Sequence, residues 1–362
     1  MAKELIMKNA WKISTQLIVA FAIVCFVMGA AAHAAGELEF AESNPVASNQ
    51  HQMAFHYGKE QMCKLVHARF ISADANLSPA KQVADINTFI QQKVNGITSW
   101  TLDQGAATAV YQRAHDAGIP IVTENSPGQF VNTVFVQEQN VTRKAQEDAA
   151  RLIAGVYPGG KIIIVGGEPV PYILYVTRNM QNAAKEAGLK VLARQDNLTD
   201  QANGAHQIVQ DLMTKYPDVN AIWCFNDRSA LGASAAVRAM GKKVYDTARP
   251  KEGGIIITGM NGTAEALDAV KAGVITATYG GQSEKVGAAE VELLYRVASG
   301  KMAAKDMPSV IVCPYKRWDG ANIGKVVYPL KRKIRMGVLD EFINYSTDPK
   351  TIDDFLLFVK KL

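Results

Sequence analysis

The chain has 362 residues, 48% of them hydrophobic and 20% charged, a composition that is ordinary for a globular protein. Its length is enough for two domains, each with its own hydrophobic core. The formal net charge of +5 at pH 7 is small for this length and gives no reason to expect a nucleic-acid partner. The basic run at 331–335 is interpreted as a solvated face.

The amino-terminal segment has the three parts of a secretory signal peptide. Three lysines in the first 12 residues precede an uninterrupted apolar run at 17–30, and Ala32 and Ala34 are small residues two positions apart. A membrane anchor is the alternative, but about 14 apolar residues are too few to span ~30 Å of hydrocarbon as a helix. We therefore expect residues 1–34 to be a signal peptide that is cleaved after Ala34, and the mature protein to be periplasmic. Loss of three Lys and one Glu leaves a formal charge of about +3.

Strands and helices alternate at short range from Glu37 onward. The helix after Asn76 is the best marked, because Ser78 can cap it, Pro79 lies in its first turn and Gly96 stops it. In this half, strands are predicted at 37–41, 67–72, 96–100, 119–124 and 133–136, and helices near 53–66, 78–96, 107–117 and 141–156. Such alternation is typical of parallel strands joined by right-handed crossovers.

A second alternating series begins at Lys161. In it, strand 221–225 leads through Asn226 and Asp227 into a helix whose small apolar residues recur at helical spacing. The other strands of this series are predicted at 161–165, 190–195, 254–259 and 274–279, and the other helices at 172–187, 202–215, after Asn261-Gly262-Thr263, and at 283–299.

Two complete series predict an α/β protein with two similar open parallel-sheet lobes. No Ser- or Gly-rich linker separates them, which indicates a hinge of several crossing strands instead of one tether. We assign 35–137 plus 282–311 to the amino-terminal lobe, 138–281 to the carboxy-terminal lobe, and 312–362 to a carboxy-terminal extension of unknown role. Within the extension, 340–342 and 352–361 are predicted to be short amphipathic helices.

The sequence contains no strong enzymatic motif. Residues 155–161 satisfy the first seven positions of a phosphate-binding loop, but Ile162 stands where Ser or Thr should hold magnesium, and the loop enters a strand instead of a helix. A secreted α/β hydrolase acting on a carbohydrate is the alternative function, because fold alone does not exclude catalysis. Its acid–base pair would be Glu124 with Glu42 or Glu168.

Metal and redox sites are not predicted either. The spacing of His51, His56 and His67 places no two of them on one helical face, so neither a metal nor a cofactor is expected. The three cysteines outside the signal segment are odd in number and widely spaced, which gives no metal or redox motif. A disulfide between Cys63 and Cys313 stays open, since the expected compartment is oxidising.

Polar side chains recur at the carboxyl ends of successive predicted strands, the edge at which open α/β sheets bind ligands. A sugar hydroxyl both donates and accepts hydrogen bonds, so carboxamides and carboxylates suit it, while the C–H faces of the ring pack on aromatic side chains. Asp227 can also cap its helix, which is a purely structural role. The predicted ligand-binding residues are Asn44, Ser99, Trp100, Glu124, Asn125, Asn226, Asp227, Asn261 and Gln282.

From Glu37 to about Ser309 the chain resembles the type I periplasmic sugar-binding proteins of bacterial ABC importers, which include the ribose-, galactose- and allose-binding proteins. The segments that carry the resemblance are Ser78-Pro79-Ala80-Lys81-Gln82, Gly118-Ile119-Pro120-Ile121-Val122-Thr123, Tyr216-Pro217-Asp218-Val219, Phe225-Asn226-Asp227, Ala230-Leu231-Gly232-Ala233 and Gly259-Met260-Asn261-Gly262. The resemblance implies two lobes that close on a sugar across three hinge strands. It also implies a monomer without catalysis or cofactor that delivers its solute to a membrane permease, and that can also serve a chemoreceptor. A sugar-responsive repressor shares these lobes, but it needs a helix-turn-helix where this chain has a signal peptide.

The resemblance also assigns binding roles to individual residues, and at some positions this sequence differs from the residues that are usual in the family. Asn226 matches a sugar-binding Asn, while Asn125 and Asn261 stand where an Asp is common. The position around Leu174 is apolar where many members have an Arg, and the usual aromatic pair after the first strand is Val46-Ala47 here, although Phe55 could reach back. We therefore expect a ligand whose hydroxyl pattern differs from that of ribose.

Overall fold

The computed structural model describes residues 37–138, 143–326 and 328–345. Their strands form two six-stranded sheets, in the orders β11-β5-β4-β3-β1-β2 (sheet A) and β12-β10-β9-β8-β6-β7 (sheet B). Sheet A is wholly parallel and consists of β1 (Glu39–Asn44), β2 (Arg69–Asp74), β3 (Gly96–Ser99), β4 (Ile121–Glu124), β5 (Thr133–Gln137) and β11 (Val310–Cys313). Sheet B consists of β6 (Lys161–Gly166), β7 (Lys190–Asp196), β8 (Ala221–Cys224), β9 (Ile256–Met260), β10 (Ala277–Gly280) and the antiparallel edge strand β12 (Lys316–Asp319).

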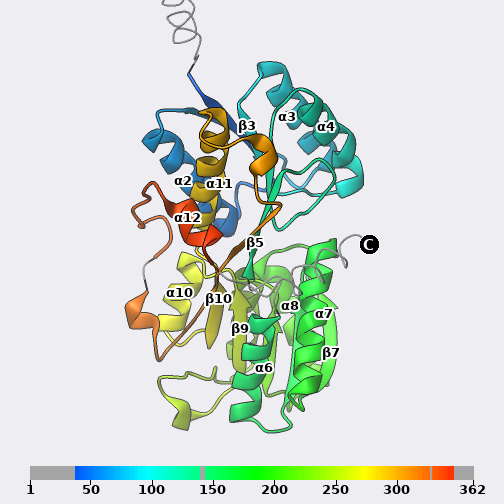
Figure 1. The fold of residues 1–362 in the computed structure, drawn as a ribbon. Coiled ribbons are helices and arrows are strands. Elements are labelled where there is room, and N and C mark those ends of the chain that lie inside the picture. Colours follow the sequence, from blue (N-terminus) through cyan, green and yellow to red (C-terminus); the bar gives the residue numbers. More distant parts are fainter. Residues whose placement is uncertain (1–36, 139–142, 327, 346–362) are drawn as a thin grey trace, which may run out of the picture. The chain divides into compact units, whose positions relative to one another are not determined.

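Helices cover both faces of each sheet (Figure 1). Those of the sheet A lobe are α2 (Gln50–Leu65), α3 (Pro79–Gln92), α4 (Gln104–Asp116), α11 (Ser283–Ala298) and α12 (Val338–Ile343). Those of the sheet B lobe are α6 (Lys144–Val156), α7 (Pro171–Glu186), α8 (Ala202–Lys215), α9 (Asp227–Ala239) and α10 (Ala264–Lys271). The two open lobes predicted from the alternating pattern are therefore confirmed.

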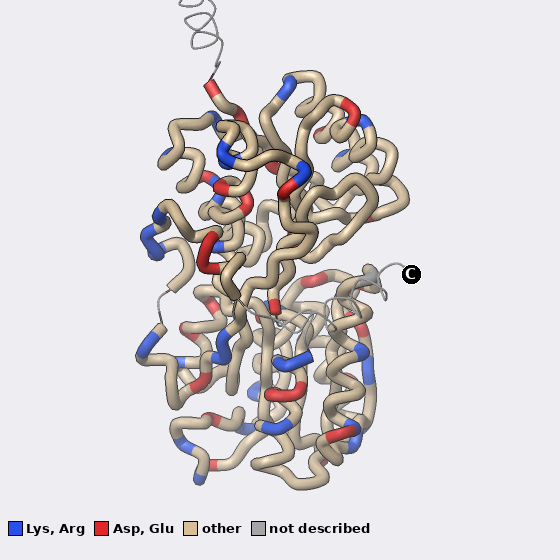
Figure 2. The backbone as a smooth tube through the Cα atoms, in the orientation of Figure 1, with Lys and Arg blue, Asp and Glu red and all other residues tan. Residues whose placement is uncertain are grey.

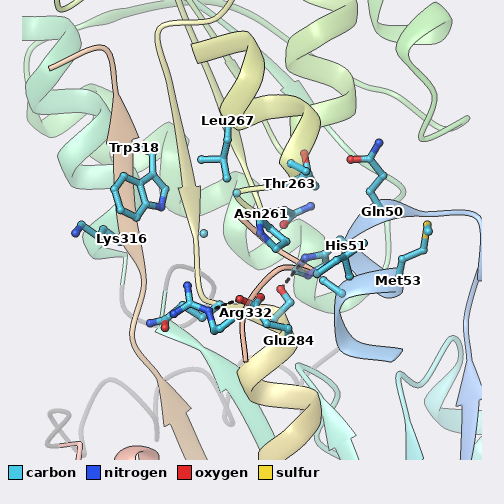
Figure 3. A pocket seen from close by; sticks show the side chains of 18 of the residues that line it. Gln50, His51, Met53, Asn261, Thr263, Leu267, Glu284, Lys316, Trp318 and Arg332 are labelled. Atoms are coloured by element: carbon cyan, nitrogen blue, oxygen red, sulfur yellow. Dashed lines mark hydrogen bonds and ion pairs between the residues drawn. The ribbon is translucent and has the colours of Figure 1, made fainter. Parts of the chain in front are cut away.

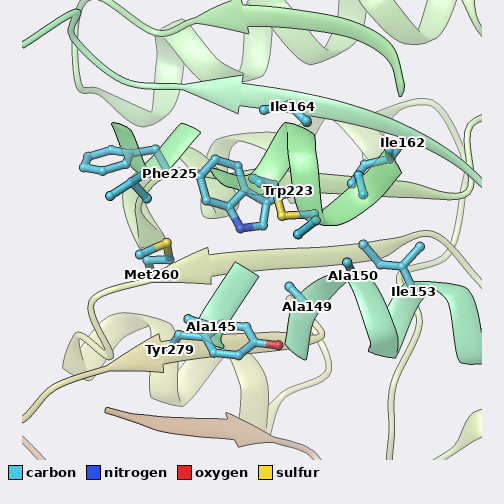
Figure 4. Packing of buried hydrophobic residues seen from close by; sticks show 14 of the residues in the cluster. Ala145, Ala149, Ala150, Ile153, Ile162, Ile164, Trp223, Phe225, Met260 and Tyr279 are labelled. Carbon is cyan, nitrogen blue, oxygen red and sulfur yellow. The ribbon is translucent and has the colours of Figure 1, made fainter. Parts of the chain in front are cut away.

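Alternation along the strands explains why sheet B is covered on both faces. In β6, Ile162 and Ile164 pack with residues of α6 and α7, whereas Ile163 and Val165 pack with residues of α8, α9 and α10. Figure 4 shows the first of these clusters, with Trp223 of β8 at its centre. All these side chains are at most 1% exposed. Full burial of such a side chain is worth roughly 1.5–3 kcal/mol, so each face makes its own contribution to holding the lobe together.

The chain crosses between the sheets three times. It passes from β5 in sheet A to α6, from β10 in sheet B to α11, and from β11 in sheet A to β12 in sheet B. These three crossings form the multi-strand hinge that we expected because no Ser- or Gly-rich linker separates the two lobes in the sequence.

Helices α2 and α11 pack backbone to backbone, which fixes α11 to the sheet A lobe after the second crossing. A Cβ on Gly58 of α2 would overlap the carbonyl oxygen of Glu284, and a Cβ on Gly287 of α11 would overlap that of Phe55. Only glycine leaves room for this approach on both helices.

The predicted carboxy-terminal extension is not a separate unit over the residues that the structure describes. Strand β11 runs through Cys313, and β12 completes sheet B. Helix α12 packs on α11, where the buried carboxylate of Glu292 accepts hydrogen bonds from the backbone N–H groups of Gly337 and Leu339. The boundary predicted at 311/312 therefore cuts through a strand. The helix predicted at 352–361 lies outside the described residues.

The described residues contain no disulfide, and their acidic and basic side chains are mixed over the surface. All three described cysteines are buried and free, so the disulfide left open between Cys63 and Cys313 is not formed. Figure 2 shows acidic and basic positions interspersed over both lobes. No helix among the described residues is long and apolar enough to cross a membrane.

Candidate functional site

All nine predicted ligand-binding residues lie at carboxyl ends of strands or within three residues after them, but the structure gives them different surroundings. Trp100 and Asn125 line a cavity of about 860 Å³, the α7 cavity, which also touches Val170 and Tyr172. Asn261 and Gln282 line a second cavity of about 460 Å³, the α10 cavity. A small hollow of about 20 Å³ lies between Asn49, Gln50, Asn226, Asp227, Arg228, Leu231, Asn261, Thr263 and Glu265. Asn44, Ser99 and Glu124 line none of the three.

Asn226 is held by both sides of its carboxamide. Its Oδ1 accepts a hydrogen bond from Ser229 N at 2.8 Å and so caps α9, while its Nδ2 donates to Asp200 Oδ1. Asp200 also accepts from Asn49 Nδ2 of the sheet A lobe at 3.2 Å. Burial raises the pKa of the Asp200 carboxyl, and the hydrogen bonds from Asn226 and Asn49 act against that rise. Asn226 therefore lies in a polar group that draws on both lobes.

Asp227 has a structural role at this edge of sheet B. Its Oδ1 accepts from Thr278 Oγ1 at 2.5 Å, and its Oδ2 accepts from Thr263 N at 2.8 Å and from Thr263 Oγ1 at 3.0 Å. Burial raises the pKa of Asp227 to about 7, and these hydrogen bonds oppose the rise. The carboxylate thus ties the start of α9 to β10 and to the start of α10. The cap of α9 is Asn226, so the capping role considered for Asp227 is wrong.

Glu124 also has a partner of its own, in the interior of the sheet A lobe. The ammonium of Lys59 contacts Glu124 Oε1, Glu42 Oε1 at 2.9 Å and Glu290 Oε2 at 3.3 Å, and all four side chains are at most 2% exposed. Burial raises the pKa of Glu42, but the charge of Lys59 and the hydrogen bond with His56 outweigh it and lower that pKa to about 2. Glu124 was expected to face the ligand. Its carboxylate is instead used to compensate a buried cation.

The remaining residues from sheet A are held by backbone and side-chain hydrogen bonds. Asn44 Oδ1 accepts from Val46 N at 3.0 Å, and Asn125 Oδ1 accepts from Gln137 N at 3.0 Å. Asn125 has a left-handed backbone, with φ of 50°, which Asn tolerates better than most residues. These contacts fix the turns that follow β1 and β4.

Three aromatic rings form a chain across the strand ends. The ring of Trp100, after β3, meets that of Tyr172 in α7 at 5.9 Å with an interplanar angle of 83°, and Tyr172 meets Phe225, after β8, at 5.9 Å and 70°. Both are edge-to-face contacts. The ring of Phe55 does not join this row of three rings. Its side chain is 1% exposed, and its ring packs against that of His51 at a centroid distance of 4.9 Å.

Some residues that we did not select from the sequence also follow the carboxyl ends of strands, the edge at which open α/β sheets bind ligands. Asp200 follows β7, and Tyr172 lies in the first turn of the helix after β6, so both come after carboxyl ends of sheet B strands. Asn49 lies in the turn after β1 and caps α2 by accepting from His51 N. Nothing in the local sequence separates these three from ordinary turn and helix residues, and only the fold brings them together.

Contacts between the lobes gather around the turn after β1. Besides the bond between Asn49 and Asp200, Gln50 Nε2 donates to Glu265 Oε2 at 3.1 Å, and Arg228 Nη2 donates to the Ser48 carbonyl oxygen at 3.2 Å. This turn stands where the resemblance placed an aromatic pair. In this chain it supplies polar groups instead.

The described residues offer no metal site. No group of three or more His, Cys, Asp or Glu side chains within 37–138, 143–326 and 328–345 could hold a metal ion. Of the three histidines near the amino end, two have separate partners, since His56 lies against Glu42 at 2.5 Å and His51 against Ser283 at 3.1 Å.

Comparison with known proteins adds family information to this geometry. Residues 40–302 match the family model described as the periplasmic binding protein domain. A ribose import binding protein of Bacillus subtilis is 27% identical over 250 residues, which cover 68% of this chain and 77% of that protein. Two solved structures share the fold. An ABC transporter solute-binding protein of Bacillus halodurans with bound myo-inositol has a TM-score of 0.69 and 21% identity, covering 81% of this chain and 98% of that one. A periplasmic counterpart of Actinobacillus succinogenes with bound D-allose also has a TM-score of 0.69, with 20% identity over 80% of this chain and 100% of that one.

Proposed function

This chain belongs to the periplasmic binding protein family, and on that premise we propose that it is the solute-binding component of a bacterial ABC importer. It binds a monosaccharide or related polyol between its two lobes and delivers it to a membrane permease. The observation that carries the proposal is that the hydrogen bond between Asn226 and Asp200 and the row of rings of Trp100, Tyr172 and Phe225 both follow strand ends, with Phe225 directly before Asn226 in the chain.

The chemistry of these groups fits a hydroxylated ring. The Asn226 carboxamide and the Asp200 carboxylate together can donate and accept, as a sugar hydroxyl requires, and an aromatic ring beside them can pack on C–H faces. Micromolar affinity corresponds to about 8 kcal/mol, which several such hydrogen bonds and one stacked ring supply once water is excluded. Closure is then a population shift, because the ligand touches both lobes only when they are together.

Relatives with known ligands set the range of solutes to test. The names of similar proteins refer to ribose, D-allose and myo-inositol, all of them small and rich in hydroxyl groups. Asn125 and Asn261 replace acids that the family commonly carries, and Asp200 adds an acid at another strand end. These changes support a hydroxyl pattern different from that of ribose.

A secreted hydrolase, the alternative considered from the sequence, receives no support from the comparisons. Its acid–base pair would be Glu124 with Glu42 or Glu168, and Glu124, which both pairs need, contacts Lys59 in the interior of the sheet A lobe, as Glu42 does. We therefore expect no turnover of a glycoside.

The family supports a periplasmic location and a permease partner for this chain. We expect export to the periplasm with cleavage after Ala34, in a segment that lies outside the described residues. A permease is the expected partner, a chemoreceptor is a further one, and the protein is expected to act as a monomer.

The test is a thermal-shift panel of pentoses, hexoses and polyols on the mature chain. At least one of them should raise the melting temperature, and Asn226→Ser should abolish that shift. Serine is chosen because it preserves the helix cap while removing the amide donor. Asn220→Ser, the same substitution at the opposite, amino end of β8, is the matched control and should keep the shift. A shift with an unrelated metabolite and with no carbohydrate would show that the solute class is wrong.

A further inference from the structure

The α10 cavity is built from the lobes and from residues beyond the family domain. The family match ends at residue 302, whereas this cavity is lined by Lys316 and Trp318 of β12 and by Lys325, Pro329, Leu330 and Arg332. Across from them lie the start of α2 and Leu267 of α10 (Figure 3). Its volume of about 460 Å³ is within the range of small-molecule sites.

This cavity has an excess of positive charge. Lys316, Lys325 and Arg332 line it together with one acid, Glu284. Glu284 is 2% exposed and already accepts a hydrogen bond from Arg332 Nε at 2.5 Å, as the dashed line in Figure 3 marks. Within the described part of the chain, no carboxylate lies within ion-pair distance of Lys316 or Lys325. Two ammonium groups at this cavity are therefore without a counter-charge from those residues.

Its other walls suit a hydroxylated ring. The Lys316 ammonium lies 4.3 Å from the centroid of the Trp318 ring, so an aromatic surface and a cation are presented side by side. The side chains of Gln50, Asn261 and Gln282 add carboxamides. An anion attracted to Lys316 would hold the rest of its molecule against tryptophan and amides.

The cavity also shares a wall with the small hollow that contains Asn226. Asn261, Gln50 and Thr263 line both the α10 cavity and the small hollow that contains Asn226. In sheet B, β9 and β10 lie between β8 and β12, so a ligand that reached from Asn226 toward Lys316 would pass Asn261, which follows β9.

We propose that the preferred solute is an acidic sugar or polyol whose anionic group occupies the α10 cavity beside Lys316 and Lys325. The inference rests on the proposed function and makes its solute class more specific. Carboxylates and phosphates share the required chemistry, and the carboxy-terminal segment beyond the family domain supplies the cations that select them.

The experiment is calorimetric titration of the mature chain with matched ligand sets. One set is D-glucose, D-glucuronate and D-glucose 6-phosphate, another is D-galactose, D-galacturonate and D-galactose 6-phosphate, and a third is myo-inositol with its monophosphate. In at least one set, an acidic member should bind roughly ten-fold or more tightly than the neutral one, the size of one charge-assisted hydrogen bond. The carboxylate and phosphate arms identify which anion is preferred.

Paired variants test whether the cavity is responsible. The double substitution Lys316→Gln and Lys325→Gln should bring the ratio of acidic to neutral affinity close to one. The exposed pair Lys242→Gln and Lys305→Gln removes the same net charge elsewhere and should leave the ratio unchanged. Equal or tighter binding of the neutral member in every set, or a preference that survives the cavity substitutions, overturns the inference while the proposed function stands. Binding of no sugar of either kind overturns both.

Discussion

At the residue scale, Lys59 determines the role of the acids that surround it. A buried ammonium is tolerated only when paired, and Glu42 and Glu124 both contact it. Burial, and after it the charge of Glu124, raise the pKa of Glu290 well above its usual range, which favours the neutral form of this third carboxyl. The cluster joins β1, β4, α2 and α11 behind the strand ends that carry the proposed site.

Removing the cation should therefore be costly. We expect Lys59→Met to destabilise the protein by about 3–5 kcal/mol, since it leaves buried carboxylates uncompensated. Lys64→Met is the matched control on the same helix, and its mostly exposed pair with Glu60 should cost at most about 1 kcal/mol. Urea denaturation measures both. A Lys59 variant as stable as the control would contradict the account of this cluster.

The same cluster predicts an acid-dependent loss of stability. The pKa of Glu42 is about 2 in the folded protein, below its ordinary value, so the folded state binds fewer protons than the unfolded state as the pH falls. The contribution of ionised Glu42 to the free energy of unfolding is therefore fully present above a pH of about 4.5. It should disappear as the pH falls toward about 2. The difference in unfolding free energy between the wild type and Glu42→Gln should therefore shrink across this window. A difference that stays constant from about pH 5 to about pH 2.5 would show that Glu42 is not held ionised.

At the scale of elements, the contact between α2 and α11 holds the sheet A lobe together after the chain returns from sheet B. Because Gly58 and Gly287 face the partner backbone, any side chain there must push the two helices apart. The turn before α2 supplies the groups that meet Asp200, Glu265 and Arg228, so a shift of α2 would also move those contacts between the lobes.

Adding one methyl group at this contact tests it. Gly58→Ala should destabilise the protein by about 1–3 kcal/mol, the usual range for overpacking. Gly155→Ala is the control in the last turn of α6, where a Cβ meets nothing within 4 Å. This control should stabilise by up to about 1 kcal/mol through helix propensity. If thermal unfolding shows that both substitutions stabilise, the close approach of α2 and α11 is not as described.

At the scale of the whole molecule, the periodic spacing of apolar residues along the sequence predicted the two lobes well. Apolar strands such as 161–165 and well-capped helices such as the one after Ser78 carry local signals, and the fold follows from their alternation. Strands β11 and β12 were not predicted from the sequence. The antiparallel β12 pairs with β10 only after the third crossing, which no local pattern indicates.

The candidate site was less predictable than the fold. The rule that ligands meet strand ends selected Asn226 and Trp100, but it also selected Asp227 and Glu124, whose carboxylates are used internally. Sequence position cannot tell which way a strand-end side chain points, since that depends on partners far along the chain such as Thr278 and Lys59. The cations of the α10 cavity lie outside the family domain, so the resemblance gave no indication of them.

The central claim is that the lobes hold one hydroxylated solute without changing it. Its most direct test is calorimetric titration of refolded, ligand-free mature chain with the sugars and polyols above, followed by NMR of the recovered solute. The account predicts binding of one molecule per chain at micromolar or lower concentration, with the solute recovered intact. No binding by any member of the panel, or a recovered solute that has been chemically altered, would contradict it.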